Sequence, residues 1–404
     1  MPTVITNARP WGGPAGDIVV VDGRISAVVA PGGAPDAERV VDAGGRVAVP
    51  SFSDVHVHLD STRLGLPFRP HTGAPGTWNS IMNDRQHWRS AEKSVAERAT
   101  YTLGRMIALG ATRVRSHAQV DADSGLEKLE GVLAARQTHV DRASVQVVAF
   151  PQVGIHLERG VVDLLDAALA MGADLVGGID PCEIDRDPVR HLDSVFALAG
   201  KHGKGIDVHL HERGSLGLFS LDLILERVEA TAMQGLVTVS HAFCLAADSA
   251  PSRRAVERIA ELDVALTTIA PGCGLDLPLS ALVEAGVRVG LGMDGQRDYW
   301  SPYGNADMLD RTYQLAFTQG YDRAEDLDLC LAVATEGGAG VIDGARPRLG
   351  PVVGPVVGPG LAPGDPADLV LFEAESTASA VMDRPGDRLV LHRGAVVAAS
   401  GELI

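Results

Sequence analysis

The sequence predicts an α/β protein: a (β/α)8 TIM barrel joined to a small β-sandwich domain that is built from both ends of the chain. Strand-like apolar runs alternate with helical patterns through the middle of the chain, and short β-type runs fill both ends. The chain has 404 residues, 46% of them hydrophobic, which is enough to bury a large core. We expect the β-sandwich domain to comprise residues 1–49 and 355–404, and the catalytic barrel to comprise residues 50–354.

The two ends of the chain carry the pattern of short strands separated by Gly/Pro turns. The predicted strands are 4–7, 17–21, 24–29, 40–42 and 46–49 at the first end, and 367–372, 387–391 and 395–399 at the second. Neither end has enough apolar surface to be stable alone, so we expect them to form one domain together. The stretch 354–364, which is rich in Gly and Pro, is the expected linker back to this domain.

The middle of the chain contains eight strand-like runs: 52–58, 112–117, 145–151, 174–180, 205–209, 236–241, 264–270 and 287–294. Helical patterns between and after them include 94–109, 125–137, 160–171, 188–201, 221–233, 252–262 and 277–285. This alternation over about 290 residues fits a (β/α)8 barrel, whose usual size is about 250 residues plus insertions. A doubly wound open sheet is the alternative, but no Gly-x-Gly-x-x-Gly turn follows the first run.

Polar residues at the ends of these runs indicate a metal site, because barrel active sites lie at the carboxyl ends of the strands. His56 and His58 end the first run, and positions i and i+2 of a strand point to the same side. His209 ends the fifth run and Asp294 ends the eighth. Each histidine alone is more simply a core or surface residue, but the set suits Zn²⁺ or Fe²⁺ with an open position for water. His117, at the end of the second run, is an intermediate case.

Composition limits the expected partners and the expected cellular compartment of the protein. A formal net charge of −17 argues against nucleic acid or an anionic membrane as a partner. Four dispersed cysteines without a Cys-x-x-Cys pair fit a reducing compartment, and neither a signal peptide nor an apolar span is visible, so we expect a cytoplasmic protein. The His-x-Glu and Pro-Cys-x-x-Cys signature of the nucleic-acid deaminases is absent from the sequence.

Several segments together resemble the amidohydrolase superfamily, and within it the group of cytosine deaminase and N-isopropylammelide amidohydrolase. The segments are 54–60, 147–155, 174–181, 206–209, 239–241, 294–308 and 363–371. The resemblance covers nearly the whole chain. It implies a small-molecule heterocycle as the substrate and a possible homo-oligomer.

The resemblance also implies roles for individual residues. His56, His58, His209 and Asp294 fall on the positions of the metal ligands. Glu212 falls on a proton-shuttling glutamate, His241 on a histidine that polarises the attacking water, and Asp294 also takes a proton. Gln152 and Trp300 fall on substrate contacts, and His211 resembles the N-isopropylammelide enzyme. Members with two metals use a lysine at the end of the fourth strand, and 174–180 has none, so we expect one divalent ion.

The implied activity is that of a metal-dependent hydrolytic deaminase acting on a cytosine-like or related small nitrogen heterocycle. Metal-bound hydroxide would attack the ring carbon that bears the amine. The alternative is an amidohydrolase that removes an alkylamine from an N-alkyl triazine or cleaves a cyclic amide. A catalytically inactive barrel kept as a binding module is a third possibility, and the presence of every ligand position argues against it.

Four positions depart from these enzymes, and the first is Glu212, where the N-isopropylammelide enzyme has an aspartate. Gly295 stands where cytosine deaminase has a second acidic residue, and Gln119 replaces the aspartate of a His-x-Asp motif. Ser61 stands where the N-isopropylammelide enzyme has a lysine. A glycine at 295 removes a carboxylate and is expected to open space, which predicts a cavity for a ring different from or bulkier than cytosine.

Overall fold

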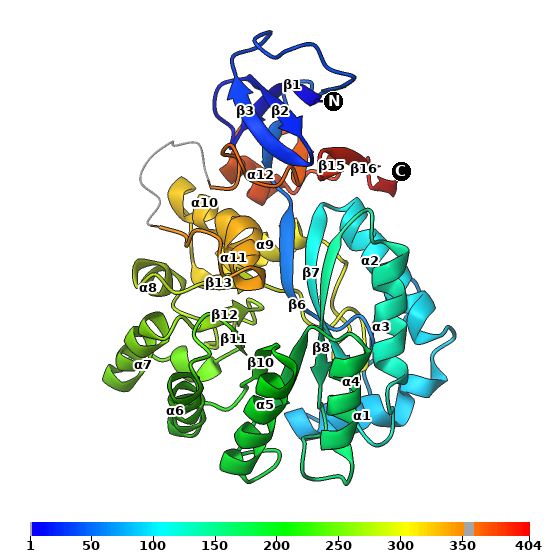
Figure 1. Ribbon diagram of the computed structural model, residues 1–404, viewed down its shortest axis with the longest axis vertical. Helices are drawn as coiled ribbons and strands as arrows, with labels where there is room; N and C mark the ends of the chain where they lie inside the picture. Colours follow the sequence, from blue (N-terminus) through cyan, green and yellow to red (C-terminus); the bar gives the residue numbers. More distant parts are fainter. Residues whose placement is uncertain (1, 351–358) are drawn as a thin grey trace.

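The computed structural model describes residues 2–350 and 359–404, and its larger part is a barrel of eight parallel strands (Figure 1). Strand order in the sheet follows chain order, with every neighbouring pair parallel. The strands are β6 (Phe52–Val57), β7 (Ala111–Gln119), β8 (Ser144–Phe150), β9 (Leu175–Ile179), β10 (Gly205–His209), β11 (Val237–Ser240), β12 (Ala265–Thr268) and β13 (Val289–Leu291). The barrel prediction and its eight strands are confirmed.

The barrel closes through the backbone of candidate ligand residues. The amide nitrogen of Asp294 donates to the carbonyl oxygen of His56 at 2.7 Å, and the amide nitrogen of His58 donates to the carbonyl oxygen of Asp294 at 3.3 Å. Asp294 adopts the left-handed conformation, with φ of 60°, just beyond β13. Closure of the barrel therefore fixes these three side chains relative to one another.

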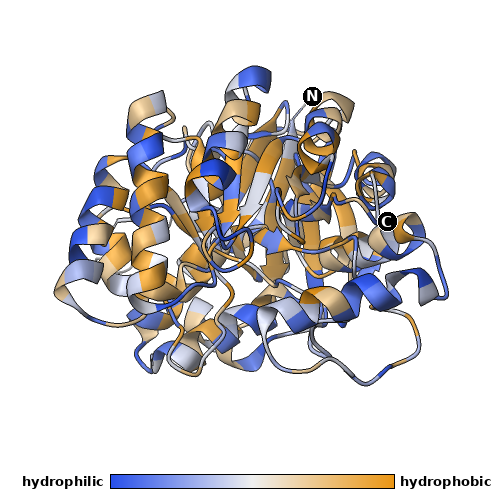
Figure 2. Cartoon of the chain, turned by 90° about the horizontal axis from the view of Figure 1, so that it is seen from below, coloured by the Kyte–Doolittle hydropathy of each residue, from blue (hydrophilic) through white to orange (hydrophobic). Residues whose placement is uncertain are grey.

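Helices surround the barrel with their apolar faces turned to the strands (Figure 2). They are α1 (Thr77–His87), α2 (Val95–Ala108), α3 (Glu127–Thr138), α4 (Val161–Met171), α5 (Pro188–His202), α6 (Gly214–Thr231), α7 (Ala250–Glu261), α8 (Leu279–Glu284), α9 (Met308–Gln319), α10 (Ala324–Ala332) and α11 (Gly338–Ile342), with α12 (Thr377–Asp383) in the C-terminal segment. In the described ranges none of these helices combines the length and the apolarity needed to cross a bilayer. The four cysteines are all free thiols.

Helix α6 begins seven residues before the predicted start of 221, at Gly214. The glycines at 214 and 217 suggest a loop in the sequence, but each has a structural use. Gly214 has a φ of +54° at the first position of the helix. A Cβ on Gly217 would lie 2.1 Å from the carbonyl oxygen of Glu212, so only glycine allows the helix to pack this closely on the preceding loop.

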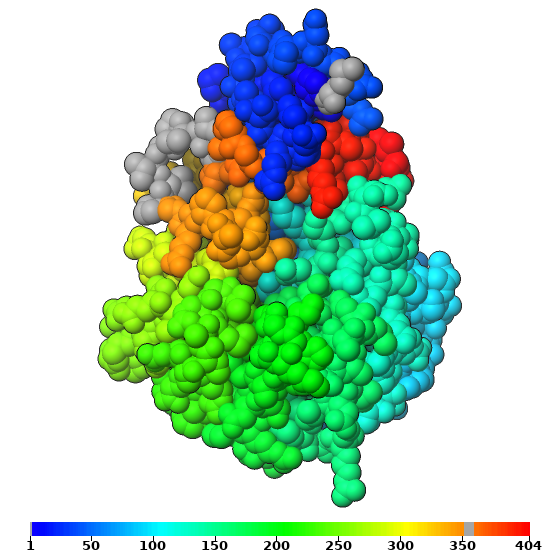
Figure 3. All heavy atoms as spheres, in the orientation of Figure 1, coloured from blue at the N-terminus to red at the C-terminus, as the bar shows by residue number. Residues whose placement is uncertain are grey.

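The ends of the chain form the second sheet together, as predicted, and lie next to each other in space (Figure 3). Its strand order is β17-β16-β15-β14-β5-β1-β2-β3, with β4 paired to β1. The strands are β1 (Thr3–Pro10), β2 (Gly16–Val21), β3 (Arg24–Val29), β4 (Arg39–Asp42), β5 (Val47–Pro50), β14 (Leu369–Phe372), β15 (Arg388–His392), β16 (Ala395–Ala399) and β17 (Glu402–Leu403). Residues 354–358 of the expected linker lie outside the described residues, and the domain boundaries stay a prediction.

Candidate active site

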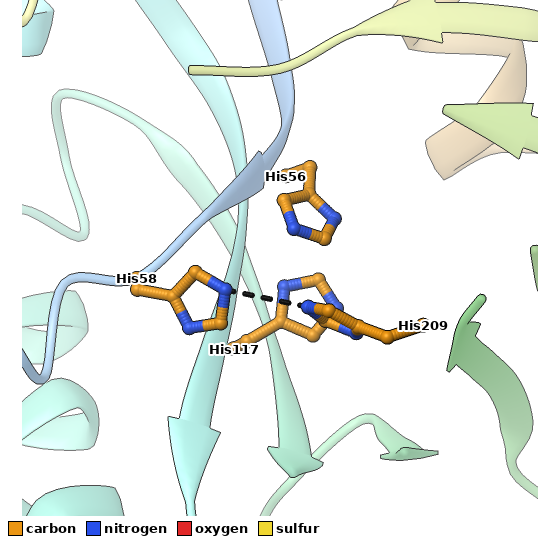
Figure 4. A group of neighbouring side chains, drawn as sticks. All are labelled: His56, His58, His117 and His209. Carbon is orange, nitrogen blue, oxygen red and sulfur yellow. Dashed lines mark hydrogen bonds between the residues drawn. The ribbon is translucent and has the colours of Figure 1, made fainter. Parts of the chain in front are cut away.

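Four buried imidazoles converge at the carboxyl ends of three barrel strands. His56 lies on β6 with His58 directly after its end, His117 lies on β7 and His209 on β10, and each offers one nitrogen within 4.8 Å of the other three. Figure 4 shows one of these contacts, in which the Nε2 atoms of His58 and His209 lie 3.3 Å apart. The i and i+2 spacing at the end of β6 therefore places His56 and His58 in one cluster.

The carboxylate of Asp294 completes the predicted set of four ligands. Its Oδ1 atom lies 3.4 Å from Nε2 of His58 and 3.6 Å from Nε2 of His56. Ligand atoms at about 2.0–2.1 Å from a tetrahedral metal are about 3.3–3.4 Å from one another. The contacts within the set, including the contact between His58 and His209, match this spacing closely.

Hydrogen bonds behind the cluster fix the tautomer of His56. Its Nδ1 lies 3.0 Å from the hydroxyl oxygen of Ser240, whose own hydrogen is donated to Asp207 at 2.6 Å. The Ser240 oxygen must therefore accept from Nδ1–H of His56, which leaves the Nε2 lone pair free to face the site. This is the arrangement by which proteins orient a histidine ligand.

Burial lowers the pKa of three imidazoles of the cluster, those of His58, His117 and His209, and so favours their neutral form. Burial, with a smaller effect of the neighbouring imidazoles, lowers the pKa of His58 to about 4 and the pKa of His117 to about 3. Nε2 of His56 and Nδ1 of His209 are buried and have no hydrogen-bond partner among the described residues. Unpaired buried nitrogens cost free energy unless something binds them. The cluster could hold a divalent metal ion, because neutral imidazole nitrogen is a common metal ligand.

His241 lies beside the cluster of four imidazoles, and His117 is a member of it. His241 has a φ of 70° directly after β11, and its ring lies 4.6 Å from that of His56. His241, His56 and Asp294 also make a compact group of possible ligands. His117 lies among the four imidazoles, although the sequence left its role open; its position at a strand end was the available signal.

A cavity of about 150 Å³ opens beside the cluster. It is lined by His58, Ser61, Phe150, Gln152, Ile179, His209, His211, Asp294, Gly295, Asp298, Trp300 and Ser301. Its volume equals that of an engineered apolar cavity that binds benzene, so it fits one small ring. Phe150, Ile179 and Trp300 give it an apolar wall, and within the described chain Nε2 of Gln152 is buried without a hydrogen-bond partner. Gln152 and Trp300, the two residues predicted to contact the substrate, thus both line this cavity.

His211 lines the cavity, whereas Glu212 does not. His211 follows His209 by two positions, and its Nδ1 lies 2.7 Å from Oδ2 of Asp180. Burial lowers the pKa of His211, but the charge and hydrogen bond of Asp180 outweigh it and leave the pKa raised. The carboxylate of Glu212 instead accepts hydrogen bonds at 2.8 Å from the amides of Cys182 and Glu183 and a further one from Ser220.

The expected space at Gly295 is filled, which corrects the prediction. A Cβ on Gly295 would lie 2.3 Å from Oδ2 and 2.9 Å from Cγ of Asp298. The carboxylate of Asp298 therefore lies over Gly295, in the space that a side chain at position 295 would occupy. Gln119 is not among the cavity residues; its side chain bonds Lys128 and Asp121 behind the site.

The fold and the site together define a class of protein, the (β/α)8 barrels with a cluster of histidines at the carboxyl ends of the strands. The sequence model of the Amidohydrolase family matches residues 39–398. The chain belongs to this family, whose members hydrolyse C–N bonds and generally bind a divalent metal ion.

Three known proteins are similar over nearly the whole chain. N-isopropylammelide isopropyl amidohydrolase of Pseudomonas sp. (strain ADP) is 30% identical over 366 residues, which is 88% of this chain and 87% of that protein. The crystal structure of N-isopropylammelide isopropylaminohydrolase from Burkholderia multivorans ATCC 17616 superposes with a TM-score of 0.91 at 38% identity, covering 100% of both chains. That of 5-methylcytosine deaminase from Klebsiella pneumoniae, liganded with 5-fluorocytosine, gives 0.81 at 25% identity, covering 99% of this chain and 97% of that one.

Proposed function

We propose that this amidohydrolase hydrolyses an exocyclic C–N bond on a small nitrogen heterocycle, releasing ammonia or a small amine. The observation that carries the proposal is the 150 Å³ cavity, which is lined by three of the four predicted metal ligands and by a polar and an aromatic substrate contact. An apolar cavity with a few convergent polar groups beside perturbed titratable residues is the usual form of a small-molecule active site.

In the proposed site one divalent ion, Zn²⁺ or Fe²⁺, is held by His56, His58, His209 and Asp294. Nitrogen and oxygen ligands in this number suit both metals. Such an ion supplies hydroxide near neutral pH by lowering the pKa of water. A single ion is favoured because β9, with the sequence Leu-Val-Gly-Gly-Ile, offers no lysine to bridge a second.

The chain's own residues then move the protons. Asp294 takes the proton of the attacking water, because its carboxylate lies at the cluster and also lines the cavity. His241 stabilises the oxygen that adds to the ring, and both of its ring nitrogens lack partners in the described part of the chain. Gln152 and Trp300 orient the ring against the apolar wall.

We assign proton delivery to the ring and the leaving amine to His211 rather than to Glu212. The ring of His211 stacks on that of His241 with centroids 4.3 Å apart, and Asp180 favours its protonated form. Glu212 has its carboxylate oxygens engaged by two backbone amides and a hydroxyl. By accepting from the amides of Cys182 and Glu183, the Glu212 carboxylate stabilises that loop, which is a structural role.

A second candidate activity is removal of an alkylamine from an N-alkyl triazine. The 38% identity to the N-isopropylammelide enzyme of Burkholderia over the full chain favours it. The presence of His211 in the cavity agrees with this candidate, whereas Ser61 in place of a lysine departs from it. Cleavage of a cyclic amide stays a further alternative.

The test is a screen for released ammonia or amine with protein loaded with Zn²⁺ or Fe²⁺. The compounds are cytosine, isocytosine, creatinine, isoguanine, ammelide and N-alkyl triazines. We expect turnover of at least one ring, lost in the variant His58→Ala. Absence of amine release from every ring by fully loaded protein would contradict the proposal. A cytoplasmic location, suggested by the free thiols, stays a prediction.

A further inference from the structure

Asp298, a buried acidic residue, lines the substrate cavity. It is buried, with 8% of the residue exposed, and it lies in the space that any side chain at 295 would need. Gly295 has no positive φ, so its backbone does not require glycine. The three nearest obstacles to a side chain at this position are all atoms of the Asp298 carboxylate.

The two oxygens of this carboxylate differ in their hydrogen bonds: Oδ1 accepts two short ones from backbone amides, whereas Oδ2 has one long contact with a hydroxyl. Oδ1 accepts from the backbone amides of Trp300 and Ser301 at 2.8 and 2.9 Å. Oδ2 has the Ser61 hydroxyl at 3.3 Å, and that hydroxyl also points to the carbonyl oxygen of His58 at 3.4 Å. A hydroxyl has one hydrogen, so it cannot serve both acceptors.

These partners of Asp298 include no cation, although a buried carboxylate normally has one. Burial raises the pKa of Asp298 to about 7, with the two backbone amides acting in the opposite direction. Oδ2 needs a strong donor, and because Asp298 lines the substrate cavity, a bound ring can supply one. Gln152, on the same cavity, has the opposite need, because Nε2 is a donor that lacks an acceptor among the described residues.

We propose that Asp298 is a specificity-determining residue that accepts a hydrogen bond from an N–H group of the substrate ring, and that Gly295 is glycine to leave room for it. The inference rests on the proposed function and narrows its substrate class. The ring carries an N–H donor for Asp298 and a carbonyl or similar acceptor for Gln152. Rings in lactam form have both groups.

The variant Asp298→Asn tests this assignment and can keep the hydrogen bonds from the backbone amides of Trp300 and Ser301. The asparagine oxygen can still accept from Trp300 and Ser301, and its NH2 group then replaces the acceptor that faces the ring. For the ring found in the screen, kcat/KM is compared with that of analogues methylated at each ring N–H. In the wild type, assayed well above the pKa of Asp298 so that the carboxylate is ionised, one methyl position should cost roughly 10- to 100-fold in kcat/KM, as expected for a hydrogen bond to a charged group.

In Asp298→Asn this discrimination should collapse, because the parent ring loses its acceptor. A ratio equal to that of the wild type would overturn the proposal, since it is the result expected of a purely structural cap. The variant Gly295→Ala should cause the same loss by displacing the carboxylate. Gly200→Ala, on α5 with nothing within 4 Å of the added Cβ, is the matched control and should leave the ratio unchanged.

The two proposals fail in different ways. If the wild type releases no amine from any ring, the proposed function fails. If the wild type turns over a ring but no methylated analogue is discriminated through Asp298, only the role of Asp298 fails. Metal content, measured on every variant, should equal that of the wild type, because Asp298 is not a proposed ligand.

Discussion

Replacing Ser240 by alanine should weaken metal binding without removing a ligand. The Ser240 hydroxyl accepts from Nδ1 of His56 at 3.0 Å and donates to Asp207 at 2.6 Å, so it orients the ring and fixes its tautomer. Loss of such a support typically costs 10–100-fold in metal affinity. This corresponds to about 1.4–2.7 kcal/mol, which agrees with about 0.5–1.5 kcal/mol for one hydrogen bond plus the cost of an unsatisfied buried Nδ1.

The assay is a competition titration of Zn²⁺ between the protein and a chelator of known affinity. Ser249→Ala is the control, because Ser249 caps α7 by accepting from the amide of Ser252 at 3.2 Å, far along the chain from any proposed ligand. It should lower the free energy of unfolding by about 0.5–2 kcal/mol and leave the affinity for Zn²⁺ unchanged. An affinity of Ser240→Ala equal to that of the wild type would refute the role of His56 as an oriented ligand.

Three further predictions concern proton transfer and stability. His211→Asn should lower kcat by roughly 100-fold or more, as expected for loss of a general acid. Glu212→Gln should lower kcat much less. If Glu212→Gln has the larger effect, Glu212 and not His211 is the proton donor. Lys128→Met should lower the free energy of unfolding by about 3–5 kcal/mol, because it leaves Asp84 buried without its partner at 2.7 Å, and adding Asp84→Asn should recover part of the loss in urea unfolding. Burial raises the pKa of Asp185, but its hydrogen bond to a buried histidine and its other partners lower it more, so its contribution is present above about pH 4 and lost as the pH falls further. Asp185→Asn should therefore flatten the decline of the free energy of unfolding in acid, and an unchanged decline would contradict this.

The barrel could be predicted because its signals are local. Each strand is a short apolar run between helical patterns, and all eight are found within a few residues of the expected bounds. The cluster could be predicted for a similar reason: parallel strands bring their carboxyl ends to one edge, so His56, His58, His209 and Asp294 had to lie near each other. Alternation along an extended chain also explains why His211 faces the cavity beside His209.

What the sequence could not show depends on loops and on close packing. The position of the Asp298 carboxylate over Gly295 depends on the turn made by residues 295–301, and the conformation of such a turn has no periodic pattern in the sequence. The direction of the Glu212 carboxylate depends on the amides of the loop after β9, which lies 30 residues earlier in the chain. Alignment to a motif gives the position of such a residue and leaves the direction of its side chain open.

The most direct test of the account is a titration of metal-free protein with Zn²⁺ or Fe²⁺ in which bound metal and amine release are measured on the same samples. We predict that activity rises in proportion to bound metal and reaches its plateau at one ion per chain. Full turnover without metal, or a plateau that needs two ions per chain, would contradict it.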